Sequence, residues 1–146
     1  MLLKKAERRY QLDTADYGRL AAFRQALREF LHFSEHAAGE LGLTAQHYQA
    51  MLVLRACPED MRMTINDLAR QLLIKHNSAV GLVDRLVAEK LVAREPSEAD
   101  RRKVELRLSA RGRQVLAKLA AIHRQELERV GPLMGRLVTA VRKERW

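Results

Sequence analysis

The stretch from Thr64 to Gly112 decides the fold, and its sequence is TINDLARQLLIKHNSAVGLVDRLVAEKLVAREPSEADRRKVELRLSARG. Its first half predicts a short helix, a tight turn and a second helix that begins near His76, because apolar residues recur there with helical spacing. Its second half predicts two strands, 91–95 and 103–108, around a charged loop, since polar and apolar residues alternate in the second of them. Two helices joined by a short turn and followed by a hairpin make a winged helix-turn-helix.

The start of the first helix in this stretch carries a capping pattern. Thr64 is expected to be the N-cap, and Asp67 stands three residues later, where a carboxylate meets the positive end of the helix. In the same way Thr44 is expected to cap a helix over 45–56, and Ser109 to cap the helix that follows the hairpin.

Amphipathic helices flank the winged region at both ends of the chain. Thr14 is expected to be the N-cap of the first, which is expected to run past residue 38 because its apolar residues follow a three-four spacing. At about 25 residues it would be roughly 38 Å long, so part of its apolar face is expected to pack on another subunit. Gly131-Pro132 is expected to end the helix after the hairpin, and a last short helix to follow it. The predicted fold is therefore mainly α with a small β-hairpin.

Composition narrows the class of protein. The chain has 146 residues, which favours a single domain, and Lys plus Arg number 27 against 18 for Asp plus Glu, a net charge of +9. Such an excess predicts binding to a polyanion, with nucleic acid as the first candidate. The single cysteine, Cys57, excludes an intramolecular disulfide and fits a reducing cytoplasm. No apolar run is long enough for a membrane span, so no membrane partner is expected.

Five short segments, in their order and spacing, resemble the MarR (multiple antibiotic resistance regulator) family of bacterial transcription factors. They are Leu68-Ala69, Leu82-Val83-Asp84-Arg85-Leu86, Leu91-Val92, Asp100-Arg101-Arg102 and Leu108-Ser109-Ala110-Arg111-Gly112. The resemblance implies a homodimer in which helices at about 13–43 and 109–146 interleave, with the winged DNA-binding region at about 44–108. It also implies a recognition helix in the major groove, a wing in the minor groove, and control by small anionic or phenolic effectors or by thiol oxidation.

Three positions depart from the family's pattern. Leu73 stands where a glycine is usual, and Lys75 stands where Ser or Thr commonly caps the recognition helix. Gly81 replaces a longer side chain, which removes one possible base contact and lets the backbone approach the groove more closely. The base preferences of relatives are therefore not transferred to this chain.

The recognition helix supplies most of the candidate DNA contacts. Asn77 can pair with adenine and Ser78 can bind a base or a phosphate, whereas Lys75 is expected to bind phosphate. His76 can reach a phosphate or a guanine edge, and Arg85 can contact the DNA backbone or pair with a neighbouring acid. The competing interpretation is that these are ordinary solvated residues. The DNA-binding set on the helix is Lys75, His76, Asn77, Ser78, Gly81 and Arg85.

The wing supplies the remaining contacts. Residues 94–113 hold seven Lys or Arg and four acids, a net charge of +3. Arg101, Arg102 and Lys103 form the tip, and Asp100 is expected to orient an arginine rather than to meet DNA itself. Arg102 is the expected minor-groove arginine, because narrow A·T-rich grooves have a deepened negative potential. A solvated charged loop is the alternative interpretation.

Other residue types give weaker hypotheses. An effector pocket is expected between the helices and is assigned to Phe30, His36, Tyr48 and Met51. His32 and His36 are four residues apart and could share a metal ion, but they could equally line a pocket or face a dimer partner. Cys57 has no cation beside it in sequence, which favours a packed thiol over a redox switch.

The sequence therefore predicts a cytoplasmic, dimeric DNA-binding regulator without a cofactor. No phosphate loop, paired-cysteine site or nucleophile motif is present, so an enzyme is not expected. The expected mechanism is repression at a palindromic operator, with release when a small-molecule effector changes the spacing of the two recognition helices. The alternatives are a metal-responsive regulator that uses His32 and His36, and a winged-helix adaptor that binds another protein.

Overall fold

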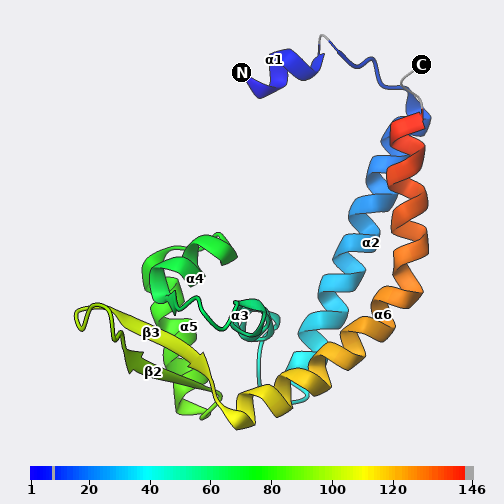
Figure 1. The fold of residues 1–146 in the computed structure, drawn as a ribbon. Helices are drawn as coiled ribbons and strands as arrows, with labels where there is room; N and C mark the ends of the chain where they lie inside the picture. Colours follow the sequence, from blue (N-terminus) through cyan, green and yellow to red (C-terminus); the bar gives the residue numbers. More distant parts are fainter. Residues whose placement is uncertain (8, 144–146) are drawn as a thin grey trace. The chain divides into compact units, whose positions relative to one another are not determined.

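The structure is a computed structural model that describes residues 1–7 and 9–143. Figure 1 shows a mainly helical chain with a small sheet. Within the described residues the elements are α1 (Leu2–Glu7), α2 (Thr14–Gly39), α3 (Ala45–Ala56), β1 (Met63–Thr64), α4 (Ile65–Leu72), α5 (His76–Ala88), β2 (Val92–Pro96), β3 (Val104–Leu108) and α6 (Ala110–Lys143). This order confirms the predicted winged helix-turn-helix between long flanking helices.

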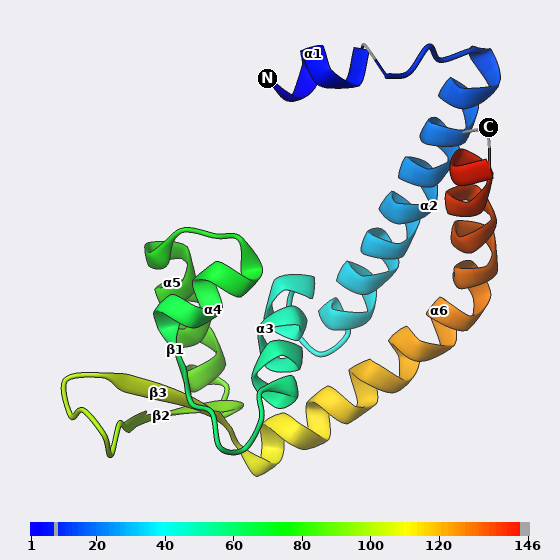
Figure 2. The ribbon, with the colours of Figure 1, turned by 45° about the horizontal axis from the view of Figure 1, so that its top comes forward.

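The chain divides into two compact units. The helical unit comprises Met1–Phe33 and Gln125–Trp146, and the winged unit comprises Ser34–Arg124. In the helical unit, α2 and the later part of α6 run alongside each other in both views (Figures 1 and 2). The division of these segments into dimerisation helices and a DNA-binding region stays a prediction.

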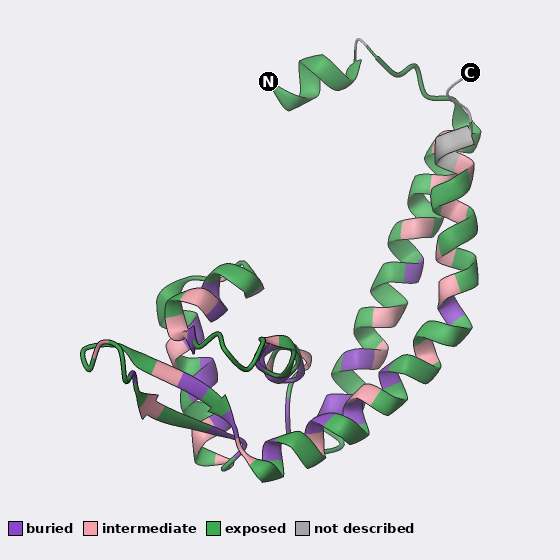
Figure 3. Cartoon of the chain, in the orientation of Figure 1, coloured by how far each residue is buried: buried purple, intermediate pink, exposed green. Residues whose placement is uncertain are grey.

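The core of the winged unit is built from α3, the helix-turn-helix, the base of the hairpin and the start of α6 (Figure 3). Its most deeply buried large side chains are Met51, Leu68, Val83, Leu86 and Leu119. Each is an aliphatic or thioether side chain on the apolar face of its element, as the helical spacing predicts. No helix in the described part of the chain is both long and apolar enough to cross a membrane.

The sheet has three strands rather than the two that the sequence predicts. β2 and β3 form the expected antiparallel hairpin, with Val92 opposite Leu108 and Pro96 opposite Val104. β1 pairs with the other edge of β3, where Met63 lies opposite Leu106. A strand of two residues is too short to show alternation, so its pairing depends on β3 being in place.

The N-cap of α2 differs from the predicted residue, Thr14. Asp13, rather than Thr14, occupies the capping position: the Asp16 backbone N–H donates to Asp13 Oδ1 at 2.8 Å, and the Asp13 N–H donates to Asp16 Oδ2 at 3.0 Å. Thr14 is already inside the helix. Asp and Thr both cap helices well, and a pair of carboxylates three residues apart satisfies two backbone donors at once.

The end of the chain differs from prediction more clearly. Gly131-Pro132 was expected to separate two helices, but α6 is one helix of 34 residues with Pro132 inside it. A proline removes one backbone hydrogen bond and crowds the preceding turn, while the turns on either side keep their bonds. The sequence also predicts that the last helix ends in the segment 142–146, which lies partly outside the described residues.

A buried polar cluster in the winged unit joins the end of α2 to α3 and α6. The His123 side chain is 3% exposed, with Nδ1 at 2.6 Å from the Leu119 carbonyl oxygen and Nε2 at 2.7 Å from Ser34 Oγ. Because the carbonyl can only accept, Nδ1–H is the donor there. In the neutral tautomer that carries this proton, Nε2 accepts from the Ser34 hydroxyl. The Tyr48 ring stacks on the imidazole with centroids 4.0 Å apart.

The junction between the hairpin and α6 has almost no free space. Ser109 caps α6 as predicted, since its Oγ accepts the Gly112 N–H at 2.9 Å. A Cβ on Gly112 would lie 2.1 Å from the Leu91 carbonyl oxygen and 3.1 Å from a Leu108 side-chain carbon. Gly112 is therefore required by the close approach of the first turn of α6 to the start of β2.

Gly112→Ala is expected to lower the free energy of unfolding by about 3 kcal/mol, because the methyl group overlaps backbone that cannot move away. Gly81→Ala is the matched control, since a Cβ there meets nothing within 4 Å and α5 gains about 1 kcal/mol of helix propensity. Urea unfolding followed by circular dichroism measures both. Equal effects of the two substitutions would contradict the close-packed junction.

Candidate nucleic-acid interface

The first helix of the helix-turn-helix is fixed by its cap. Thr64 Oγ1 accepts the Asp67 N–H at 3.2 Å, and the Asp67 carboxylate accepts the Thr64 N–H at 3.0 Å, which confirms the predicted capping box. The hydrogen bond from the Thr64 backbone is the main cause that lowers the pKa of Asp67 below its usual range. Asp67 also pairs with Arg70 one turn later.

The turn depends on a residue in a strained conformation. Leu73 has φ 55° and ψ 41°, the left-handed region, and its side chain is almost fully exposed. Its N–H and that of Ile74 donate back to the last carbonyls of α4, Ile74 to Ala69 at 3.0 Å. Glycine adopts this conformation without strain, which explains why Leu73 is the unusual residue of the turn.

Leu73→Gly is expected to raise the free energy of unfolding by about 0.5–1 kcal/mol, because it relieves left-handed strain without removing buried surface. The opposite change, Gly42→Ala, is expected to lower it by a similar amount, since Gly42 has φ 70° and open space around its Cα. Thermal unfolding of both variants measures the pair. A destabilised Leu73→Gly protein would show that the exposed leucine has a packing role.

The recognition helix α5 leaves its first turn exposed. Ala79, Leu82, Val83 and Leu86 are its buried face, whereas His76, Asn77, Ser78 and Gly81 are exposed. Lys75 is the N-cap residue and makes no side-chain cap hydrogen bond, so the first N–H groups of α5 are not satisfied by their own cap. Unsatisfied N–H groups at a helix start are suited to bind phosphate oxygens.

His76 is held by the preceding helix. Its Nδ1 lies 2.6 Å from Asn66 Oδ1, so Nδ1–H donates to the amide oxygen. This bond ties the first residue of α5 to the first turn of α4, across the turn at Leu73. Asn66 was not predicted as part of the site. Its sequence position could have identified it: Asn66 is the second residue of α4, and its side-chain amide takes no part in the capping box of Thr64 and Asp67.

The wing tip is an ordered turn. The Ser97 N–H donates to the Lys103 carbonyl at 2.9 Å, and the Lys103 N–H donates to the Asp100 carbonyl at 2.9 Å. Asp100 Oδ1 accepts both the backbone N–H of Arg102 at 3.1 Å and its Nε–H at 3.2 Å. These bonds, the backbone one first, lower the pKa of Asp100, so the carboxylate that holds Arg102 is ionised at neutral pH. The Arg102 side chain remains 91% exposed.

A surface groove of about 440 Å³ joins the helix-turn-helix to the wing. It is lined by Thr64, Ile65, Asn66, Asp67, Arg70, His76, Arg102, Lys103 and Val104. The groove brings together three of the predicted DNA-binding residues: His76, Arg102 and Lys103. Lys75, Asn77, Ser78 and Gly81 lie outside its lining, on the first turns of α5. Arg70 also lines the groove, although the sequence does not predict it as a DNA-binding residue.

Ion pairs separate the basic residues into two groups. Arg94 pairs with Asp84, Arg107 with Glu95 at 3.1 Å, and Arg85 with Glu89 at 3.3 Å, while Arg85 also donates to the Gly42 carbonyl at 3.2 Å. Arg85 thus makes contacts inside the protein, and its assignment to DNA stays a prediction. Among the described residues, the cations at the interface that lack an acid within 4 Å are Lys75, Arg101 and Lys103.

The assignment of an effector pocket to Phe30, His36, Tyr48 and Met51 stays a prediction. Tyr48 and Met51 are buried, and burial raises the pKa of Tyr48. His36 is exposed, with Nε2 3.8 Å from Glu40 Oε1, and Phe30 belongs to the other unit. None of the four lines the groove. In the described chain, no three His, Cys, Asp or Glu side chains group as a metal site would require.

Comparison with known proteins finds transcriptional regulators of similar sequence and fold. Residues 41–103 match the MarR family. AbsC, a MarR family transcriptional regulator from Streptomyces coelicolor, shares 25% identity with a TM-score of 0.71, over 82% of this chain and 80% of that one. A probable transcriptional regulator from Pseudomonas aeruginosa shares 27% identity with a TM-score of 0.63, over 82% and 88%.

A third similar structure is the transcriptional repressor CouR bound to a 23-mer DNA duplex, with 23% identity, a TM-score of 0.67, and coverage of 90% of this chain and 99% of that one. No curated protein matches the sequence. The helix-turn-helix and the basic hairpin define a winged helix-turn-helix protein of the DNA-binding class. Residues 41–103 of the chain match the MarR family, and the chain resembles solved MarR family transcriptional regulators in its fold.

Proposed function

We propose that this regulator is a homodimeric repressor that binds a palindromic operator and leaves it when a small-molecule effector binds. The observation that carries the DNA-contact part is the groove at which the start of α5 and the wing tip meet. His76, Arg102 and Lys103 come to it from segments up to 27 positions apart, and each reaches it through backbone or side-chain bonds made within the winged unit.

The chemistry of the two halves of this surface suits the two grooves of duplex DNA. A helix start with exposed Asn77 and Ser78 offers an amide and a hydroxyl to base edges in the major groove. Arg102, extended on an ordered turn, offers a guanidinium to the narrower minor groove. Lys75, Arg101 and Lys103 then serve phosphates, which fix the position of the protein without specifying sequence.

Dimerisation is supported by exposed apolar residues in the helical unit. Tyr17, Leu20, Leu27 and Leu31 of α2 are between 37% and 62% exposed, and their spacing places them on one helix face. Leu127, Leu133 and Val138 of α6 are also exposed, by 43–49%. A row of exposed leucines is costly in water and is expected to be covered by a second copy. In such a dimer two recognition helices would lie about 34 Å apart, one turn of DNA.

The two alternatives lack an observation in their favour. His32 and His36 are exposed, and His36 faces Glu40 rather than a set of ligands. A protein-binding adaptor would not need exposed cations at both the recognition helix and the wing. Repression, rather than activation, is supported by CouR, a repressor of the same fold. The effector part rests on the family resemblance.

Arg102→Ala is expected to weaken binding to duplex DNA by roughly tenfold and to reduce the slope of log affinity against log salt by about 1, because one counterion fewer is released. Lys118→Ala, an exposed cation on α6 away from the groove, is the matched control and should leave both unchanged. Fluorescence anisotropy over a salt series measures the effect. No binding of the unaltered protein to any duplex at low salt would contradict the proposal.

Sedimentation equilibrium is expected to show a dimer at micromolar concentration, and Leu31→Glu to shift it toward monomer, because a charge cannot be buried unpaired at the interface. Leu52→Glu alters an equally exposed leucine on α3 and should leave the dimer intact. A monomeric unaltered protein, or equal effects of the two substitutions, would contradict α2 as the dimer surface.

A further inference from the structure

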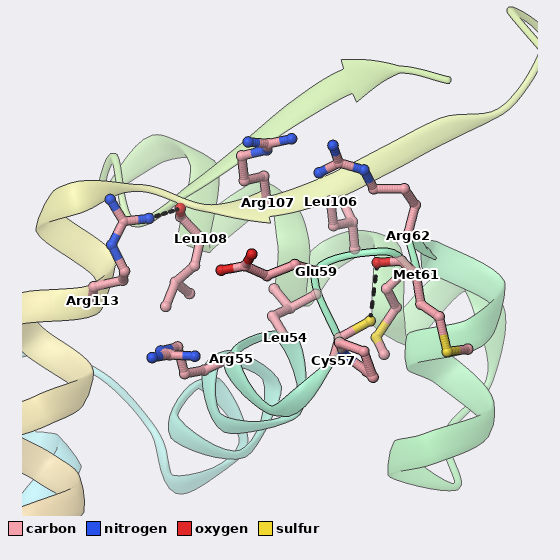
Figure 4. A pocket seen from close by; sticks show the side chains of 12 residues that line it. Leu54, Arg55, Cys57, Glu59, Met61, Arg62, Leu106, Arg107, Leu108 and Arg113 are labelled. Carbon is pink, nitrogen blue, oxygen red and sulfur yellow. Dashed lines mark hydrogen bonds between the residues drawn. The ribbon is translucent and has the colours of Figure 1, made fainter. Parts of the chain in front are cut away.

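A second cavity lies at the base of the hairpin, away from the groove at the wing. It has a volume of about 500 Å³ and is formed by the end of α3, the segment 57–63, β3 and the first turn of α6 (Figure 4). It is lined by Leu54, Arg55, Cys57, Pro58, Glu59, Met61, Arg62, Met63, Leu106, Arg107, Leu108 and Arg113. All of these residues belong to the winged unit, and none was predicted as an effector site.

The lining of this cavity is strongly basic. Four of its side chains are arginines and one is a carboxylate, Glu59. Arg62 and Arg107 have acidic partners on the sheet, Glu105 at 3.7 Å and Glu95 at 3.1 Å. Arg55 has no acidic partner among the described residues, and the Arg113 guanidinium donates to the Leu108 carbonyl at 3.2 Å without an acidic partner in that part of the chain. In the described part of the chain, two guanidinium groups of the lining therefore have no acid within 4 Å.

Figure 4 shows Arg55 and Arg113 on the same side of the cavity, with the Glu59 side chain pointing into its middle. Glu59 makes no ion pair within 4 Å in the described structure, although arginines surround it. Arg55, Arg113 and Glu59 thus line the same cavity, and Glu59 would repel an anion bound there. A carboxylate can take two parallel N–H donors from a guanidinium, which makes arginine pairs good carboxylate sites.

The floor of the cavity is aliphatic. Leu54, Met63, Leu106 and Leu108 are each at most 8% exposed and give the ligand apolar contact. The lining contains no aromatic side chain, so nothing in it would stack on a ring. The volume lies within the range of small-molecule sites. A basic rim over a leucine floor is suited to a short molecule with an anionic head and an aliphatic body.

We propose that this cavity binds a small aliphatic carboxylate, with its head on Arg55 and Arg113 and its chain on Leu54 and Leu108. Glu59 sets the affinity by opposing the bound charge. The cavity is connected along the chain to both parts of the DNA-contact surface, because Met63 precedes the cap of α4 and Leu106 lies in the strand that leads from the wing. Calling the ligand an effector rests on the proposed function, whereas its binding does not.

Hexanoate is the probe, titrated into the full-length, DNA-free protein by isothermal calorimetry. We expect binding in about the millimolar range, and at least tenfold weaker binding of hexanamide, which has the same chain without the charge. Equal binding of hexanoate and hexanamide would overturn the proposal, as would tighter binding of hexylamine than of hexanoate. Either result leaves DNA binding untouched, so failure here is distinct from failure of the proposed function.

Substitutions within the cavity test its geometry. Arg55→Gln is expected to weaken hexanoate binding about tenfold, and Glu59→Gln to tighten it about fivefold, because each removes one charge close to the bound head. Arg111→Gln removes an exposed cation just outside the lining and should change nothing. Arg55 and Glu59 make no ion pair with any described residue, so both variants should remain folded. An unchanged affinity in Arg55→Gln, or a weakened one in Glu59→Gln, would overturn the assignment.

Discussion

The close approach of α6 to Leu91 is the constraint on which the winged unit depends. Ser109 Oγ donates to the Lys90 carbonyl at 2.7 Å and accepts the Gly112 N–H, while the Ser109 N–H donates to the Leu91 carbonyl at 2.9 Å. One residue thereby connects the end of α5, the start of β2, the end of β3 and the start of α6. Because the hairpin is fixed at its base, its tip is brought to a defined place beside the helix-turn-helix.

A second set of contacts prepares the surface for an anion. The capping box at Thr64 and the bond between Asn66 and His76 fix the two helices across the strained turn at Leu73. At the wing, the Asp100 carboxylate accepts hydrogen bonds from the backbone N–H and the Nε–H of Arg102, and the guanidinium stays exposed. The acids near the interface are thus used to position cations, and the cations left without acids are the ones that can meet phosphate.

Much of the fold could be predicted from the sequence because its signals are local. Helical spacing and the caps at Thr44, Thr64 and Ser109 located α3, α4 and the start of α6, and alternation located the hairpin. The remaining features depend on contacts between distant residues. β1 exists only because β3 lies beside it, and Pro132 is tolerated because the long helix around it keeps its other bonds.

The candidate DNA-binding site likewise combines features that local sequence predicts with features that depend on tertiary packing. The residue types at the start of α5 and at the wing tip could be chosen from sequence, since exposed polar groups at a helix start and adjacent cations in a loop are local patterns. Their meeting at one groove and the part played by Asn66 and Arg70 could not, because each depends on the packing of α4 against α5 and the wing. The hydrogen bond from Arg85 to the Gly42 carbonyl could not either, because the two residues are 43 positions apart in the chain. The basic cavity under the hairpin was missed for the same reason, since its arginines come from four separate segments.

Amide hydrogen exchange, compared between the free protein and the protein bound to duplex DNA, tests the central claim most directly. The account predicts that DNA slows exchange in two separate segments, the first turns of α5 from Lys75 to Gly81 and the wing tip from Asp100 to Lys103. Residues 55–62, at the cavity under the hairpin, should exchange at the same rate in both states. Protection at 55–62 with none at the wing tip would contradict the assignment of the DNA-binding surface.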